Sequence, residues 1–440
     1  MSFTWREIAV RDRLSQSPRG IAAFWFALTF RLASGALIAS MAMLNGCAQR
    51  PTTTTASTDA SATATATAPA IAAATVADPE GAESLIRAAI TSGEVKGLAI
   101  AVIEDGQIRA VRTYGHRNAG GQALQTGTVM YGASLTKTVF AYTVMQLVDE
   151  GKLDLDASIA TLLDRPLPDY PKDSRYAPWP DLRGDERWRA LTPRMLLSHR
   201  SGFGNFAFLE PDGKLRFHFD PGSRYAYSGE GLILLQFVLE QGRLRLDLGQ
   251  EMQRRVFDRF GMTMTDMKWR ADFAANLADG VTETRRWVPH DPRSRVRAAG
   301  SMDTTIDDFA RFAAGLARGD GLSPRSRAEM VRPQAPITTA SQFPTLQPEL
   351  PASQRRSDLA AGLGVVVFDG PQGRGYFKGG HDDQTGNTMV CVEQRRACVV
   401  LLSNDVMAER LYPAIVRRVL GETGVPFMWE YGPKASSWDR

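Results

Sequence analysis

The chain has 440 residues, 43% of them hydrophobic and 23% charged, which suits a globular protein with a large core and enough length for two or three domains. Its formal net charge is +4, but residues 1–46 hold five arginines and two acids and therefore carry +3 of it. The rest of the chain therefore has a net charge of only +1. This charge is too small to indicate nucleic-acid binding, and we expect no nucleic-acid partner.

Residues 1–46 predict a secretory signal, because arginines precede the apolar run 32–44 and small residues follow it. The ending Leu44-Asn45-Gly46-Cys47 resembles the lipobox of bacterial lipoproteins, in which the cysteine is lipidated and becomes the first residue. The alternative is a signal-anchor helix over residues 21–44, interrupted by Arg31. Both alternatives export the protein. Lipidation of Cys47 would make it a periplasmic, membrane-anchored lipoprotein, and we expect the outer membrane.

The segment 47–79 is predicted to be a flexible tether, since residues 51–77 are almost all threonine, alanine and serine and cannot bury a core. A single catalytic domain is predicted over residues 80–430, followed by a C-terminal tail, 431–440. The domain begins with a hairpin signal: residues 97–103 and 108–114 alternate apolar and polar positions around Glu104-Asp105-Gly106-Gln107.

A helix is predicted over residues 137–150, where Phe140, Val144 and Leu147 share a face. Ser134 lies one helical turn before Lys137, so the two side chains are expected on the same face. A lysine amine with a lowered pKa can take the proton of a serine hydroxyl, which makes the pair a candidate nucleophile and base.

Two long stretches, 164–191 and 333–358, lack strong periodicity and are rich in proline and aromatic residues. Loops of this length inside a domain are usually functional or disordered. Both are predicted to gate a substrate site, with disorder as the alternative for the second. Helices are expected over 233–240 and 306–317.

The C-terminal part predicts three or four strands, over residues 363–368, 375–379 and 387–404, and a closing helix over 405–420. Cys391 and Cys398 flank a polar turn, so a symmetric hairpin sets them opposite each other, either as a disulfide or as two buried thiols. A sheet from both chain ends (about 80–130 and 360–430) with flanking helices and an inserted, mostly helical domain (about 131–359) is an α+β fold.

Four motifs occur in an order that resembles one known family. They are Ser134-Leu135-Thr136-Lys137, the Thr-x-x-x-Leu-Leu-x-His-x-Ser-Gly stretch within 191–203, Tyr227-Ser228-Gly229 after Asp220-Pro221-Gly222, and Phe377-Lys378-Gly379-Gly380-His381. Ser-x-x-Lys is the nucleophile signature of serine β-lactamases and penicillin-binding proteins. Over residues 85–425 the set resembles the class C β-lactamase-related serine hydrolases, which include D,D-peptidases and esterases. The resemblance implies the β-lactamase/transpeptidase-like fold, with the active site between the sheet and the helical domain.

The resemblance also implies roles. Ser134 would attack a carbonyl carbon and form an acyl-enzyme, with Lys137 and Tyr227 competing as the base and Tyr225 as the fallback. We expect the neighbouring ammonium to lower the pKa of Tyr227, so that the two groups share one proton. His199 is expected to be structural.

The oxyanion would be met by the backbone N–H groups of Ser134 and His381, with Gly379 and Gly380 allowing close approach. Lys378 would attract a substrate carboxylate; the alternative is an edge-strand lysine that protects against aggregation. His381 and Asp382 could complete a Ser-His-Asp triad, but the family works without histidine. The histidines lack metal-ligand spacing, so no metal and no cofactor are predicted.

Two positions depart from the family pattern. Gly229 replaces an asparagine whose amide contacts the substrate's acylamino group, and Gly379 replaces a threonine or serine near the substrate carboxylate. Both departures argue against efficient β-lactam hydrolysis. The sequence thus predicts an exported serine hydrolase that cleaves an ester or amide in a small-molecule or peptide acyl substrate. The alternative is a penicillin-recognising binding or scaffold protein of the cell envelope without turnover.

Overall fold

The computed structural model describes residues 78–433. The predicted signal, Cys47 and nearly all of the predicted tether lie outside the described residues. Within 78–433, none of the helices has the length and apolar character needed to cross a membrane.

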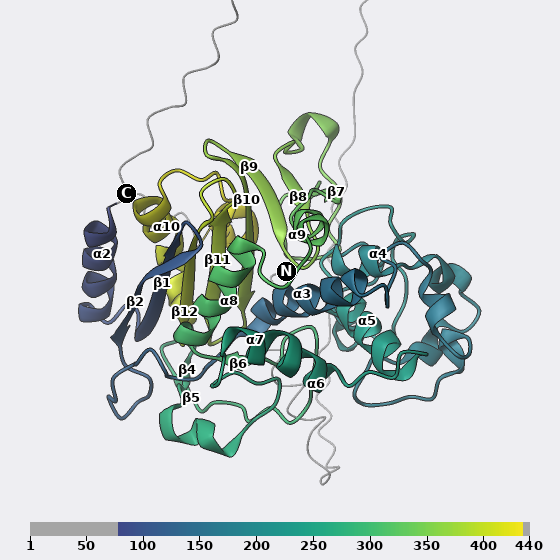
Figure 1. Ribbon diagram of the computed structural model, residues 1–440, viewed down its shortest axis with the longest axis horizontal. Helices are drawn as coiled ribbons and strands as arrows, with labels where there is room; N and C mark the ends of the chain where they lie inside the picture. Colours follow the sequence, from purple (N-terminus) through teal and green to yellow (C-terminus); the bar gives the residue numbers. More distant parts are fainter. Residues whose placement is uncertain (1–77, 434–440) are drawn as a thin grey trace, which may run out of the picture. The chain divides into compact units, whose positions relative to one another are not determined.

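In this part of the chain, eight strands form one antiparallel sheet in the order β2-β1-β12-β11-β10-β9-β8-β7 (Figure 1). The strands are β1 (Gly97–Glu104), β2 (Gln107–Gly115), β7 (Ala335–Pro336), β8 (Leu359–Ala361), β9 (Val366–Gly370), β10 (Gly373–His381), β11 (Gly386–Val392) and β12 (Ala397–Ser403). Because β1 pairs with β12, the N-terminal hairpin and the C-terminal strands meet within one sheet. The predicted α+β fold is confirmed.

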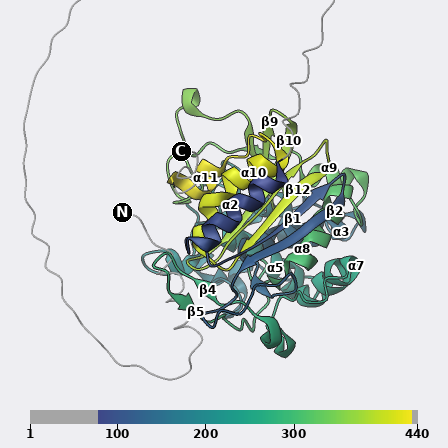
Figure 2. The same cartoon turned by 90° about the vertical axis from the view of Figure 1, so that its left-hand side faces the viewer.

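Helices cover both faces of this sheet, which explains why β11 and β12 are largely apolar and are buried along their whole length. The first face packs against α2 (Pro79–Thr91), α10 (Tyr412–Leu420) and α11 (Phe427–Tyr431), as Figure 2 shows. Leu98, Val399 and Leu401 point into this layer. The second face packs against α8 (Ile306–Arg318), with Ala101 and Val400 in the same cluster as Phe309.

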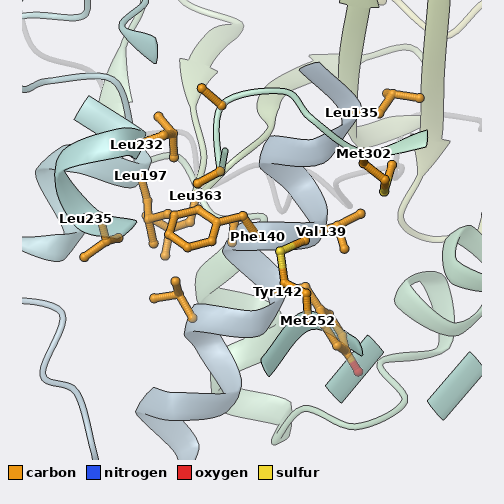
Figure 3. Packing of buried hydrophobic residues seen from close by; sticks show 14 of the residues in the cluster. Leu135, Val139, Phe140, Tyr142, Leu197, Leu232, Leu235, Met252, Met302 and Leu363 are labelled. Atoms are coloured by element: carbon orange, nitrogen blue, oxygen red, sulfur yellow. The ribbon is translucent and has the colours of Figure 1, made fainter. Parts of the chain in front are cut away.

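The helical part is built around α3 (Thr136–Asp149), in which every residue from Thr136 to Leu147 is buried. The surrounding helices are α4 (Pro193–Leu197), α5 (Gly229–Gln241), α6 (Leu248–Met252), α7 (Asp258–Phe260) and α9 (Pro324–Met330). Short strands pair locally: β3 (Met130–Tyr131) with β6 (Asp303–Thr304), and β4 (Gly280–Val281) with β5 (Trp287–Val288). Figure 3 shows Phe140 directed toward Leu197 and Leu363, which joins α3 to its neighbours.

Several predicted boundaries differ from the structure. The helix expected at 306–317 is α8, but it packs on the sheet, and β7 and β8 also belong to the sheet, so residues 131–359 are not a purely helical insert. The strand expected at 363–368 is only partly present: residues 363–365 form the connection between β8 and β9, and residues 366–368 begin β9. Tyr431, assigned to the tail, ends α11, is buried, and donates a hydrogen bond to the carbonyl of Asn387 at 3.1 Å. These contacts join segments that are distant in sequence, which local periodicity does not detect.

The segment 164–191 forms short 3₁₀ turns whose aromatic side chains pack inward. The rings of Tyr170, Tyr176 and Trp179 surround Phe237 of α5 at centroid distances of 4.9, 5.0 and 5.4 Å. The segment is therefore part of the hydrophobic core, which differs from the predicted gate.

Cys391 and Cys398 face each other in the register of β11 and β12 and form a disulfide, with a Cα–Cα distance of 4.1 Å. Both side chains are buried. Of the two alternatives that the sequence leaves open, the structure contains the disulfide.

Candidate active site

Ser134 lies in a 3₁₀ turn, Ala133–Leu135, that leads directly into α3. Ala133 has a φ of +46°, a left-handed conformation that is unfavourable for a residue with a Cβ atom. Strain of this kind occurs where surrounding contacts fix a functional backbone position. Here Gly132 donates its N–H to the carbonyl of Met302 at 2.9 Å, which anchors the turn.

Two side chains converge on the serine hydroxyl. Lys137 Nζ and Tyr227 Oη each lie 2.9 Å from Ser134 Oγ. Lys137 follows one turn later on α3, and Tyr227 comes from the segment just before α5. Lys137 is 1% exposed and also donates to the carbonyl of Ala299 at 2.5 Å. The structure thus brings together the three residues that the sequence predicted as the catalytic group.

Burial sets the protonation of this group. It lowers the pKa of Lys137 well below the usual lysine value, and the charge of Lys378 lowers it further. Burial also raises the pKa of Tyr227, so the predicted lowering of the Tyr227 pKa is wrong. The loss of hydration disfavours the phenolate more than the neighbouring groups stabilise it. The geometry therefore favours a neutral lysine amine beside a protonated tyrosine.

Tyr225, the fallback base, does not serve that role, since its hydroxyl lies against Gln342 Oε1 at 3.3 Å. His199 packs against Tyr227, with ring centroids 4.4 Å apart. The N–H of Ser228 donates to His199 Nδ1 at 3.1 Å. Burial lowers the pKa of His199 well below its usual value. Nδ1 of this neutral histidine also lies 3.2 Å from the carbonyl oxygen of Ser228, so the ring positions the backbone next to Tyr227.

Lys378 lies on β10, between β9 and β11 in the sheet order, and its side chain is buried, so the alternative of an exposed edge lysine that protects against aggregation is wrong. Pairing with β9 stops at Phe377, and Lys378 is the first residue beyond it. Lys378 is 3% exposed, and its Nζ lies 5.2 Å from the centre of the Tyr227 ring. Burial lowers the pKa of this lysine.

Gly380 brings β10 against the start of α3. A Cβ atom at this position would lie 2.8 Å from both the Gly132 carbonyl oxygen and the Leu135 nitrogen, so only glycine fits without movement of the backbone. The backbone of β10 therefore passes directly beside the Ser134 turn. This is the arrangement that an oxyanion site shared by Ser134 and His381 requires.

The side chain of His381 is directed elsewhere, with Nδ1 2.8 Å from Glu409 Oε1. Burial opposes protonation of His381, but the carboxylate of Glu409 outweighs it and the pKa is raised. Asp382 accepts hydrogen bonds from the N–H groups of Gln384 and Thr385, at 2.9 Å each. A Ser-His-Asp triad is therefore not formed. Within residues 78–433, no group of three or more His, Cys, Asp or Glu side chains is arranged to hold a metal ion.

The sequence interpretation missed three residues around the site. The ring of Phe206 occupies the space that a side chain at Gly229 would need, and the Glu430 carboxylate does the same at Gly379. Phe343 lies 5.4 Å from the Tyr227 ring, on the loop predicted as a gate, which is ordered here and joined to α11 by the Gln342 N–H and the Trp429 carbonyl at 2.8 Å. The sequence signal for Glu430 is an acid inside the apolar run 427–431.

A protein-family model described as Beta-lactamase matches residues 82–420. The chain is 25% identical over 209 residues to probable fimbrial assembly protein FimD, serogroup H1, of Dichelobacter nodosus, covering 42% of this chain and about half (48%) of that relative. It is 26% identical to penicillin-binding protein 4 of Amycolatopsis lactamdurans, over 78% of this chain and 90% of the relative.

The chain is also 25% identical to lovastatin esterase of Penicillium rubens, over 69% of this chain and 79% of the relative. Among solved structures, one described as a class C β-lactamase superposes with a TM-score of 0.61 at 16% identity, over 78% of this chain and 95% of that chain. The structural likeness bears on the fold, and it agrees with the sheet and helical part described above.

Proposed function

The chain belongs to the β-lactamase family, and from this premise we propose that it is a serine hydrolase that cleaves an ester or amide through an acyl-enzyme on Ser134. The observation that carries the proposal is the position of Ser134 Oγ, 2.9 Å from both Lys137 Nζ and Tyr227 Oη. A serine beside an amine with a lowered pKa is the arrangement that activates a hydroxyl for nucleophilic attack.

The protonation states give each residue a role. As Ser134 Oγ bonds to the substrate carbonyl carbon, its proton passes to the neutral amine of Lys137. The negative charge on the carbonyl oxygen is met by backbone N–H groups of Ser134 and His381. Tyr227 gives its proton to the leaving oxygen or nitrogen and recovers one from Lys137. Water then attacks the acyl carbon and gives a proton to the neutral amine of Lys137, the bond between the acyl carbon and Ser134 Oγ breaks, and Ser134 Oγ takes up that proton as the acid leaves.

The surroundings of Gly229 support an ester substrate with an apolar acyl group. Phe206 fills the position of the family's asparagine amide, and its ring stacks on Phe208 with centroids 5.1 Å apart. An aromatic surface cannot donate a hydrogen bond to the acylamino group of a β-lactam. The similarity to lovastatin esterase agrees with the ester hypothesis.

We also propose that the protein is exported and lipid-anchored through Cys47. The disulfide between Cys391 and Cys398 supports export, because structural disulfides persist mainly in oxidising compartments outside the cytoplasm. The proposed anchor rests on the resemblance of residues 44–47 to a lipobox.

The proposal is tested by assaying the purified protein and Ser134→Ala with p-nitrophenyl butyrate, nitrocefin and a D-alanyl-D-alanine peptide. We expect turnover of the ester that Ser134→Ala abolishes. Labelling of Ser134 by penicillin without turnover of any substrate would favour the binding-protein alternative. Ester turnover that survives Ser134→Ala would contradict the mechanism.

A further inference from the structure

Glu430 is a buried carboxylate at the active site that the proposed mechanism does not use. It lies on α11, is 4% exposed, and neither carboxylate oxygen has a hydrogen-bond partner among residues 78–433. A buried charge without hydrogen bonds is costly, so its retention calls for a nearby compensating charge or a ligand.

The carboxylate occupies the space next to Gly379, one residue beyond Lys378. A Cβ atom at Gly379 would clash with Glu430 Oε1 and would lie 3.0 Å from the hydroxyl oxygen of Tyr431. The serine or threonine that the family pattern has at this position would therefore require the carboxylate of Glu430 to move. The glycine and the glutamate form one structural unit, in which a carboxylate replaces a hydroxyl.

The electrostatic neighbours of Glu430 include the two lysines of the site and the His381–Glu409 pair, in which Glu430 raises the pKa of both members. Its negative charge favours the protonated forms of both Lys378 and Lys137. A negative charge beside Lys378 cancels much of the attraction that this lysine would otherwise exert on an anionic group of a substrate. The lost hydroxyl and the added carboxylate both weaken the binding of a substrate that carries an anionic group at this position.

We propose that Glu430 sets the charge selectivity of the site: the enzyme accepts esters whose leaving group is neutral or carries an ammonium, and rejects a leaving group that carries a carboxylate. The leaving group is the relevant side because the carboxylate of a D-alanyl-D-alanine peptide belongs to the residue that departs. The inference rests on the proposed Ser134 hydrolase function and specifies its substrate class.

The test uses three esters of phenylacetic acid that differ only in charge, with phenol, 3-hydroxybenzoate and 3-(aminomethyl)phenol as leaving groups. The kcat/KM of each ester is divided by its own rate with hydroxide, which removes differences in chemical reactivity. We expect kcat/KM of the wild-type protein to be about tenfold or more higher for the neutral and ammonium esters than for the carboxylate ester. Repulsion between two like charges at a site shielded from water changes a binding free energy by about this much.

Glu430→Gln keeps the shape of the side chain and removes its charge. Relative to kcat/KM for the neutral ester at the same pH, it should raise kcat/KM for the carboxylate ester at least fivefold and lower kcat/KM for the ammonium ester. Glu422→Gln removes the same charge from an exposed position on the same C-terminal segment and should leave all three ratios unchanged. Wild-type preference for the carboxylate ester, or ratios that Glu430→Gln does not move, would overturn the inference.

A second pair of variants covers the case in which Glu430→Gln does not fold. Gly379→Thr alone should unfold at a lower temperature because of the clash, whereas Gly379→Thr combined with Glu430→Ala should fold and gain activity toward the carboxylate ester. A double variant that folds without this gain would contradict the inference. Failure of the proposed function and failure of the role of Glu430 can be told apart. If the wild-type protein shows no Ser134-dependent turnover of the neutral ester, the proposed function is rejected. If it turns over the neutral ester and Glu430→Gln leaves the relative kcat/KM values of the three esters unchanged, only the role of Glu430 is rejected.

Discussion

The hydroxyl of Tyr227 lies 2.9 Å from Ser134 Oγ, although 93 positions separate the two residues in the chain. The serine comes from the turn before α3 and the tyrosine from the segment before α5, and packing of these buried helices brings them together. Because burial raises the pKa of Tyr227, this phenol stays protonated and donates a hydrogen bond to Ser134 Oγ. In the proposed mechanism it is also the proton source for the leaving group.

Removing the Tyr227 hydroxyl should therefore impair catalysis. Tyr227→Phe is expected to lower kcat/KM for p-nitrophenyl butyrate by about 10²–10⁴-fold, the usual contribution of a positioned acid or base. Tyr225→Phe is the matched control, because it removes a hydroxyl that contacts Gln342. Equal losses in the two variants would contradict the assignment of Tyr227.

The pH dependence of kcat/KM should report the lowered pKa of Lys137. The neutral amine is the active form, so kcat/KM rises as pH increases through that pKa, at a pH well below the usual lysine value. Lys378 lowers this pKa and Glu430 raises it. Lys378→Met should thus move the rising limb to higher pH and Glu430→Gln should move it to lower pH. Identical limbs in all three proteins would contradict Lys137 as the base.

The lowered pKa of Lys137 also predicts how the free energy of unfolding changes with pH. Its pKa is lower in the folded protein than in the unfolded chain, so between the two values the unfolded chain binds more protons. The free energy of unfolding should therefore rise with pH across this window. Lys137→Met should remove this contribution, which urea titrations of both proteins at several pH values would measure.

Gly380→Ala should lower kcat/KM strongly while the protein remains folded. The added Cβ meets backbone atoms of Gly132 and Leu135 at 2.8 Å, so β10 must move away from the nucleophile. A displacement of about 1 Å at a catalytic site costs about 10²-fold in rate. Gly120→Ala, at an exposed position whose nearest contact would be 3.4 Å, is the control and should retain full activity.

His199→Ala should destabilise the folded protein by about 2–3 kcal/mol, because the buried N–H of Ser228 loses its acceptor and Tyr227 loses a packed ring. His116→Ala, at an exposed histidine, should change stability by less than about 0.5 kcal/mol. Urea unfolding followed by tryptophan fluorescence measures both. An unchanged stability in His199→Ala would show that the histidine has another role.

Replacing Cys391 and Cys398 by alanine should lower the free energy of unfolding by about 2–3 kcal/mol, the chain-entropy value for so short a loop. Thiol titration of the denatured, unreduced protein should detect neither cysteine. Two titratable thiols at these positions would contradict the disulfide.

Much of the architecture follows from local sequence patterns. Alternation predicted the β1–β2 hairpin, and an apolar stripe predicted α3. The spacing of Ser134 and Lys137 placed both side chains on one face, because the pitch of a helix fixes residues three apart. The symmetric turn between Cys391 and Cys398 likewise predicted that they lie opposite each other, since hairpin register is a local property, but left the disulfide and two free thiols as alternatives. In each case the interacting residues are close in the chain.

Other features depend on contacts between distant segments. The position of Glu430 against Gly379, the packing of α8 on the sheet and the rise in the Tyr227 pKa could not be derived from spacing. A pKa is set by the water and charges that all neighbouring elements remove or supply, and a buried carboxylate is recognised only when its surroundings are known. The spacing of Ser134 and Lys137 is therefore the basis of the proposed chemistry, while the filled spaces beside Gly229 and Gly379, which only the tertiary structure reveals, are the basis of the proposed substrate selectivity.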